Sequence, residues 1–88
     1  MSKVVLDISV VEDLKAWSRS EFHLVKKFFE LVADIHRTPF AGLGKPEPLK
    51  HQYKGYWSRR ISDEHRLIYQ VLSDGTITIA SVHGHYQQ

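Results

Sequence analysis

A glutamate held between two prolines is the residue of this sequence most suited to chemistry. Glu47 lies between Pro46 and Pro48, and a proline excludes the helical region for the residue before it, so Glu47 is extended with little freedom to lose. Its carboxylate is ionised at pH 7 and could accept a proton. Three basic residues surround it in the sequence, namely Lys45, Lys50 and His51. The pattern predicts an acid–base group that its neighbouring prolines hold in position. The alternative is an exposed loop carboxylate that neutralises nearby lysines.

Further ionisable side chains lie on predicted strands that follow this glutamate. Side chains alternate across a strand, so Arg66 is expected on the face opposite to Leu67 and therefore away from the helices. If the faces of neighbouring strands coincide, Arg60, Arg66 and His85 converge on one concave surface facing Glu47. That coincidence depends on strand register, which the sequence does not define.

Two helices should support this surface. Residues 3–8 are typical of a short strand, and Ser9 with Glu12 fits a capping box that opens a helix running to about Arg19. A second helix is expected from near Ser20 to the stop at Thr38 and Pro39. Its apolar residues recur with helical spacing, which predicts a buried stripe formed by Phe22, Leu24, Val25, Phe28, Phe29, Leu31, Val32 and Ile35.

The second half of the chain reads as a loop followed by strands. Residues 38–55 contain all three prolines and predict a long irregular connection. Three β-like runs follow at 56–62, 65–72 and 76–85, with a turn around Asp74 and Gly75 between the last two. Consecutive antiparallel pairing gives the order βααβββ. The predicted fold is therefore α+β, one small domain over residues 1–88 with two helices packed on one face of an antiparallel sheet.

Composition narrows the class of protein. A chain of 88 residues without cysteine has no disulfide scaffold, thiol nucleophile or zinc finger, and a cytosolic protein is the simpler interpretation. The sequence shows neither a signal peptide nor a membrane span. Residues 1–36 carry five Lys or Arg and six Asp or Glu, whereas residues 37–88 carry seven and four. This basic second half predicts a polyanionic partner, RNA or DNA; a basic surface kept for solubility is the alternative.

Three segments resemble one known family. They are RTPFAGLGKPEPLKH at 37–51, GYWSRRISDEHRLIYQV at 55–71 and HGHY at 83–86. Together they resemble the YoeB/Txe toxins of the RelE superfamily, the toxin halves of bacterial type II toxin–antitoxin pairs, which cleave mRNA in the ribosomal A site. The resemblance implies a RelE/microbial-RNase-like fold and a cytoplasmic, ribosome-dependent mRNA endonuclease (an mRNA interferase). The implied partners are a cognate YefM/Phd-like antitoxin, the 30S A site and mRNA; similar toxins often dimerise, and neither a cofactor nor a membrane is involved.

The resemblance also implies the site residues. The family's catalytic positions fall on Glu47, Arg66 and His85, and its RNA-contacting positions fall on Lys45, Lys50, His51, Arg59, Arg60 and Tyr86. Metal-free RNA cleavage needs a base for the ribose 2′-hydroxyl, a cation for the phosphorane and an acid for the leaving oxygen. Glu47, Arg66 and His85 would supply these in that order, with a 2′,3′-cyclic phosphate and a 5′-hydroxyl as products. Tyr86 could stack on a base or be a packed terminal aromatic.

Two alternatives without catalysis remain open at this point. One is a ParE-like toxin that acts by binding a protein target, and the other is a plain RNA-binding module. The joint presence of a base, a cation and an acid favours the enzyme. A metal site at His83 and His85 is disfavoured, because no third histidine has an obvious spacing and few carboxylates could support it.

Overall fold

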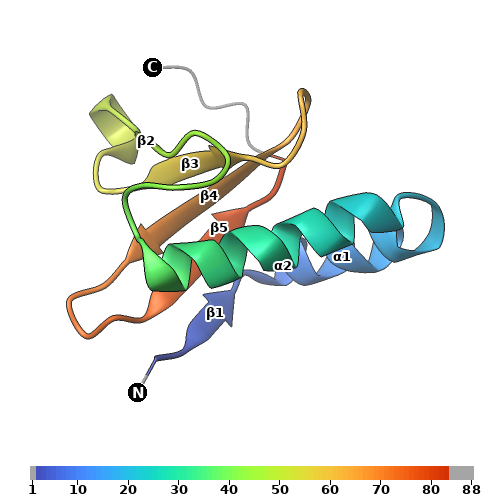
Figure 1. The fold of residues 1–88 in the computed structure, drawn as a ribbon, viewed down its shortest axis with the longest axis horizontal. Helices are drawn as coiled ribbons and strands as arrows, with labels where there is room; N and C mark the ends of the chain where they lie inside the picture. The colour runs from blue at the N-terminus through green and yellow to red at the C-terminus, as the bar shows by residue number, and fades with distance from the viewer. Residues whose placement is uncertain (1, 84–88) are drawn as a thin grey trace.

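Two helices cover one face of a five-stranded sheet in the computed structural model, which describes residues 2–83 (Figure 1). The elements are β1 (Val4–Leu6), α1 (Ile8–Ser20), α2 (Phe22–Arg37), β2 (Glu47–Pro48), the short helix η1 (His51–Tyr53), β3 (Trp57–Arg60), β4 (Arg66–Val71) and β5 (Ile77–Ser81). The strand order is β1-β5-β4-β3-β2. The expected α+β fold and the antiparallel pairing of the three later strands are confirmed.

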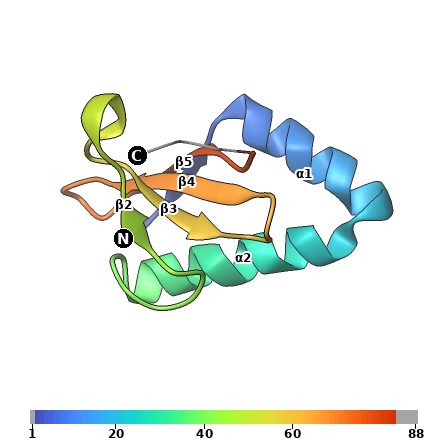
Figure 2. The ribbon, with the colours of Figure 1, turned by 90° about the horizontal axis from the view of Figure 1, so that it is seen from above.

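The structure adds two features to the expected sheet. β1 pairs parallel to β5, so the sheet is mixed. The connection at 38–55 is not irregular throughout, because it contains β2, which pairs with β3, and η1. β2 forms the edge of the sheet beyond β3, and η1 follows it away from the helices. Figure 2 shows α1 and α2 meeting at one end and diverging along the strands.

The helices begin where side chains and backbone satisfy their free N–H groups. The predicted Ser9–Glu12 capping box is wrong: α1 starts at Ile8, and the carboxylate of Asp7 accepts a hydrogen bond from the Ser9 N–H at 3.0 Å. Asp7 has the extended backbone of an N-cap, whereas Ser9 is already helical. Glu21 alone separates α1 from α2. Across residues 2–83, neither helix combines the length and apolar character that crossing a membrane requires.

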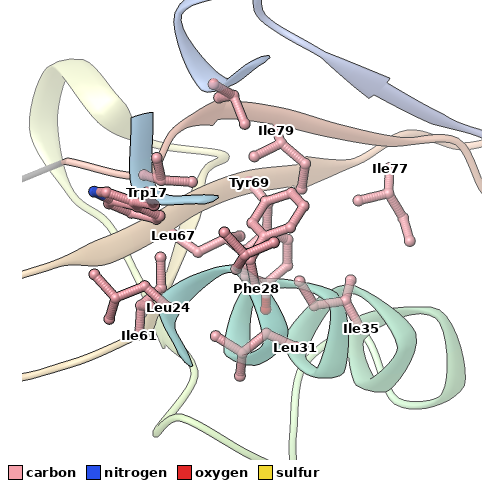
Figure 3. Packing of buried hydrophobic residues seen from close by; sticks show 13 residues of the cluster. Trp17, Leu24, Phe28, Leu31, Ile35, Ile61, Leu67, Tyr69, Ile77 and Ile79 are labelled. Carbon is pink, nitrogen blue, oxygen red and sulfur yellow. The ribbon is translucent and has the colours of Figure 1, made fainter. Parts of the chain in front are cut away.

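The core lies between the helices and the sheet. Figure 3 shows Phe28 of α2 beside Tyr69 of β4, and Ile35 of the same helix belongs to the same buried cluster as Ile77 and Ile79 of β5. Leu31 is buried too and lies against Gly44. Two residues expected in this stripe are not in it, because Phe22 and Phe29 are 57% and 59% exposed. At 3.6 residues per turn, both lie about 120° from the centre of the buried stripe. The helical spacing located α2 correctly, but the buried face that it predicted is wider than the one observed.

Strand register decides which side chains face the helices. Arg59 pairs with Leu67, and Trp57 pairs with Tyr69, so these side chains point toward the core. The alternating residues form the opposite surface, here called the outer face, which comprises Glu47, Ser58, Arg60, Arg66 and Ile68. The expectation that Arg66 lies away from the helices is therefore confirmed.

Leu31→Ala tests the packing of this core. Leu31 is fully buried, so the substitution should lower the free energy of unfolding by about 2–5 kcal/mol through lost burial and a residual cavity. Phe22→Ala is the matched control and should change stability by no more than about 0.5 kcal/mol, because the ring is exposed. Urea unfolding measures both, and a Phe22→Ala loss as large as that of Leu31→Ala would show that the stripe is placed wrongly.

Candidate functional site

The outer face brings together several of the residues that the sequence singled out. Glu47 pairs with Ser58 and Ser58 pairs with Ile68, so these three side chains form one row across β2, β3 and β4. Arg60 and Arg66 are direct partners in the next row. With neighbouring strands about 4.8 Å apart, the backbones of β2 and β4 are separated by about 10 Å. A ribose phosphate would fit between Glu47 on β2 and Arg66 on β4 if the two side chains extend toward each other across β3.

Glu47 is fixed from both sides along the chain. On one side Gly44 packs against β3, and its carbonyl accepts a 2.7 Å hydrogen bond from the Arg60 N–H. On the other side Leu49 is buried, and its N–H donates to the Tyr56 carbonyl at 2.9 Å. The extended conformation expected for Glu47 is confirmed, and its carboxylate is exposed on the outer face.

The backbone of residues 44–51, which carries Glu47, is strained at several positions. Lys45 and His51 have φ angles of 54° and 57°, in the left-handed region that non-glycine residues rarely adopt. Gly44 has a φ of 78°, and a Cβ there would come within 3.0 Å of the Arg60 carbonyl oxygen. Such strain persists only where surrounding contacts hold it. Lys45, Lys50 and His51 are exposed around Glu47, as an RNA-contacting role would require.

Arg59 is the exception among the predicted RNA contacts. Its side chain is 0% exposed and points into the core, because register pairs it with Leu67 on the helix side. Its guanidinium makes five hydrogen bonds, to Asp34 Oδ2 at 2.6 Å and to the Tyr69 hydroxyl and the carbonyls of Thr38, Ala41 and Leu43. A guanidinium has five N–H donors, and all of them are used here. The prediction that Arg59 contacts RNA is therefore wrong.

The contacts of Arg59 form what we call the arginine clamp, made of Arg59, Asp34, Tyr69 and the backbone of 38–43. Asp34 also accepts the Leu43 N–H at 2.9 Å, and the Tyr69 hydroxyl donates to the Pro39 carbonyl at 2.7 Å. The clamp binds the loop after α2 from inside the protein, directly before the segment that carries Glu47. The clamp was not predicted from the sequence. The one indication was Asp34, an aspartate among the apolar residues of α2, because a buried carboxylate requires a charged or hydrogen-bonding partner.

Hydrogen bonds control the ionisation of the clamp. Hydrogen bonds from the Leu43 N–H and the Arg59 guanidinium, with a smaller one from Arg37, favour the charged carboxylate and outweigh its burial, so the pKa of Asp34 falls from 3.8 to about 2. Burial raises the pKa of the Tyr69 hydroxyl. Asp34 is therefore ionised and Tyr69 neutral at pH 7.

The end of β5 leads toward the remaining predicted residues. His85 and Tyr86 lie outside the described residues, so their roles stay predictions. His83, expected on the last strand, follows the end of β5 at Ser81 and packs against α1: its Nε2 lies 3.3 Å from Asp13 Oδ1, and its ring centroid lies 5.4 Å from that of Trp17. Within 2–83, no group of three or more His, Asp or Glu side chains is arranged to hold a metal ion.

Comparisons with known proteins place these features in one family. The model of the YoeB-like toxins of bacterial type II toxin–antitoxin systems matches residues 6–86. The toxin YoeB of Escherichia coli K12 is 51% identical over 75 residues, which cover 85% of this chain and 88% of that protein. A YoeB dimer from Staphylococcus aureus is 41% identical with a TM-score of 0.87, covering 96% of this chain and 97% of its own. A heterotetrameric YoeB–YefM toxin–antitoxin complex from the same species matches at 43% identity with a TM-score of 0.85, covering 94% and 95%.

Arg59→Met tests the arginine clamp. Removing the guanidinium takes the buried cation from the Asp34 carboxylate, which keeps only the Leu43 N–H and the exposed Arg37 as donors, and leaves three loop carbonyls without this donor. We therefore expect unfolding to be easier by about 3–5 kcal/mol. Arg60→Met removes the same charge from the exposed neighbouring position and should change stability by about 0.5 kcal/mol or less. Equal losses in urea unfolding of the two variants at pH 7 would contradict the clamp.

The pH dependence of stability tests the ionisation of Asp34. Because its pKa is about 2 in the folded protein against 3.8 ordinarily, its contribution is present above about pH 4 and is lost as the pH falls toward 2. The urea midpoint of the wild type should fall in that window. The urea midpoint of Asp34→Asn should fall less steeply in this window. It should still fall in part, because the pKa values of Asp7 and Asp74 are also lowered in the folded protein. Asp63→Asn, at an exposed turn residue, is the control, and an unchanged slope in Asp34→Asn would refute this account.

Proposed function

Because the chain belongs to the YoeB-like toxins of bacterial type II toxin–antitoxin systems, we propose that it is a ribosome-dependent mRNA endonuclease. One observation carries the proposal: register places Glu47, Arg60 and Arg66 together on the open outer face. The whole chain would act as one toxin domain in the cytoplasm, cutting the message in the 30S A site and so stopping translation.

The proposed reaction is attack of a ribose 2′-hydroxyl on the adjacent phosphorus. Glu47 takes the proton of the 2′-hydroxyl as the new O–P bond forms, and the Arg66 guanidinium stabilises the charge that builds on the phosphorane oxygens. The bond from phosphorus to the 5′ oxygen then breaks, and His85 gives a proton to that oxygen. The products are a 2′,3′-cyclic phosphate and a 5′-hydroxyl, and no metal ion takes part.

Exposed basic residues of the outer face would hold the RNA backbone. Lys45, Lys50 and Arg60 are exposed near Glu47 and can pair with phosphates, as can His51 when protonated. Tyr86 would stack on a base. Because Glu47 and Arg60 are exposed rather than enclosed, the ribosome would supply most of the positioning that holds the RNA in an attack geometry. This accounts for ribosome dependence in so small a protein.

The same basic face would be the target of the antitoxin. The similar S. aureus toxin forms a heterotetrameric complex with YefM. We propose that this chain likewise binds a YefM/Phd-like antitoxin, whose acidic or extended segment covers Lys50 and Arg60 and blocks RNA. We also propose that two copies pair, as in the S. aureus dimer.

Glu47→Ala and His85→Ala test the chemistry on translating ribosomes. Each variant loses one proton-transfer group, so cleavage should slow by about 10²- to 10⁴-fold, measured by mapping the 5′ ends of the message over time. Glu30→Ala removes an exposed carboxylate from α2 and should cut like the wild type.

Two outcomes would contradict the proposed function. A wild type that cuts no message would leave only a toxin or an RNA-binding module that acts by binding. Variants that cut as fast as the wild type would show that the acid–base pair has been assigned to the wrong residues.

A further inference from the structure

A pocket lies on the outer face beside the proposed cleavage residues. Its volume is about 310 Å³, and it is lined by Gln52, Tyr53, Tyr56, Ile68 and Ala80. These residues come from η1, from the position just before β3, and from β4 and β5, and we call the space they line the tyrosine pocket. The segment after β2 that forms one wall lies on the side of the sheet away from the helices (Figure 1). None of the lining residues has a role in the reaction proposed above.

Strand pairing fixes the distance from this pocket to the site. Ile68, at its floor, is two residues along β4 from Arg66 and is the partner of Ser58, which in turn pairs with Glu47. Two residues of a strand span about 7 Å, and two strand spacings span about 10 Å. The distance between successive nucleotides in an extended RNA chain is similar to these spans. A nucleotide next to the cleaved bond would therefore reach the pocket.

The lining suits a flat ring with a polar edge. Ile68 is 2% exposed and with Ala80 forms an apolar floor, Tyr53 and Tyr56 supply aromatic faces, and Gln52 supplies a carboxamide that both donates and accepts hydrogen bonds. Unstacked bases of single-stranded RNA are bound in this way, by aromatic stacking and by hydrogen bonds to their edges. The volume is at the lower end of the roughly 300–1,000 Å³ of small-molecule sites, which fits one base better than a peptide segment.

Charge around the pocket favours a nucleotide over a neutral ligand. Along residues 45–60, four exposed Lys or Arg side chains, Lys45, Lys50, Lys54 and Arg60, and the exposed His51 stand against one exposed carboxylate, Glu47. An aromatic pocket on a segment rich in cations matches the two parts of a nucleotide, since the base is flat and apolar on its faces and the phosphate is anionic.

We propose that the tyrosine pocket binds one unstacked base of the message next to the cleaved bond, with a tyrosine ring on the base and the Gln52 carboxamide on its edge. This inference rests on the proposed function. The pocket would hold the substrate in register with Glu47 and Arg66 and would make cleavage depend on the identity of that base.

Tyr53→Ala and Gln52→Ala test the pocket on translating ribosomes, with 5′-end mapping across messages that present all four bases at each position of the A-site codon. Loss of a stacking residue should lower kcat/KM by about 5- to 100-fold, the equivalent of 1–3 kcal/mol. Tyr53→Phe keeps the ring and should restore most of the rate. Gln52→Ala should flatten the base preference at one codon position, an effect that a merely structural role would not produce. Phe29→Ala removes an exposed ring from α2 and is the matched control.

The outcomes separate the pocket from the reaction. If the wild type cuts no message, the proposed function fails and the pocket proposal fails with it. If the wild type cuts, and folded Tyr53→Ala and Gln52→Ala variants cut at the same rate with the same base distribution, the pocket proposal is overturned while the endonuclease stands. Weakened antitoxin binding with unchanged cleavage would also overturn it, because the pocket would then serve the antitoxin. Thermal unfolding shows which variants are folded.

Discussion

The buried ion pair between Arg59 and Asp34 is the constraint on which the geometry of the outer face depends. A charge pair inside a protein is tolerated only when its remaining donors and acceptors are satisfied. Here the loop carbonyls of 38–43 complete the set, so the loop has to close over the guanidinium. When the loop closes, Gly44 lies against β3 and Glu47 lies opposite Ser58. A structural interaction on one side of the sheet thereby positions Glu47, the proposed base, on the other.

The adjacent residues Arg59 and Arg60 illustrate how β3 contributes one arginine to the buried clamp and the next to the outer face. Alternation along β3 turns the first toward α2 and the second toward solvent. A slip of one residue in register would exchange the two side chains, burying Arg60 and exposing Arg59. The clamp's long contact, between residues 25 positions apart, therefore also specifies register. Stability and function are coupled through this register, although no residue of the clamp takes part in the proposed reaction.

Much of this architecture could be predicted from the sequence, and the failures have physical causes. Periodicity located both helices and the three antiparallel strands, and proline chemistry anticipated the extended Glu47. The resemblance assigned Arg59 to RNA contact, and that assignment is wrong because Arg59 is buried against Asp34, a partner in a distant element that the matched segments do not contain. Phe22 and Phe29 were expected in the core because spacing alone does not define how wide a buried stripe is. His83 leaves the strand pattern through tertiary contacts with α1 that no local signal contains.

The central claim is that the outer face directs a ribose 2′-hydroxyl at its own phosphate, and the most direct measurement removes that hydroxyl. A message with a single 2′-deoxynucleotide on the 5′ side of the cleaved bond, held in the A site of a ribosome, should not be cut there by the wild-type protein. The all-ribose message should be cut at the same bond to give a 2′,3′-cyclic phosphate. Cleavage of the deoxy-substituted bond at a comparable rate would contradict the account, because the nucleophile would then come from elsewhere.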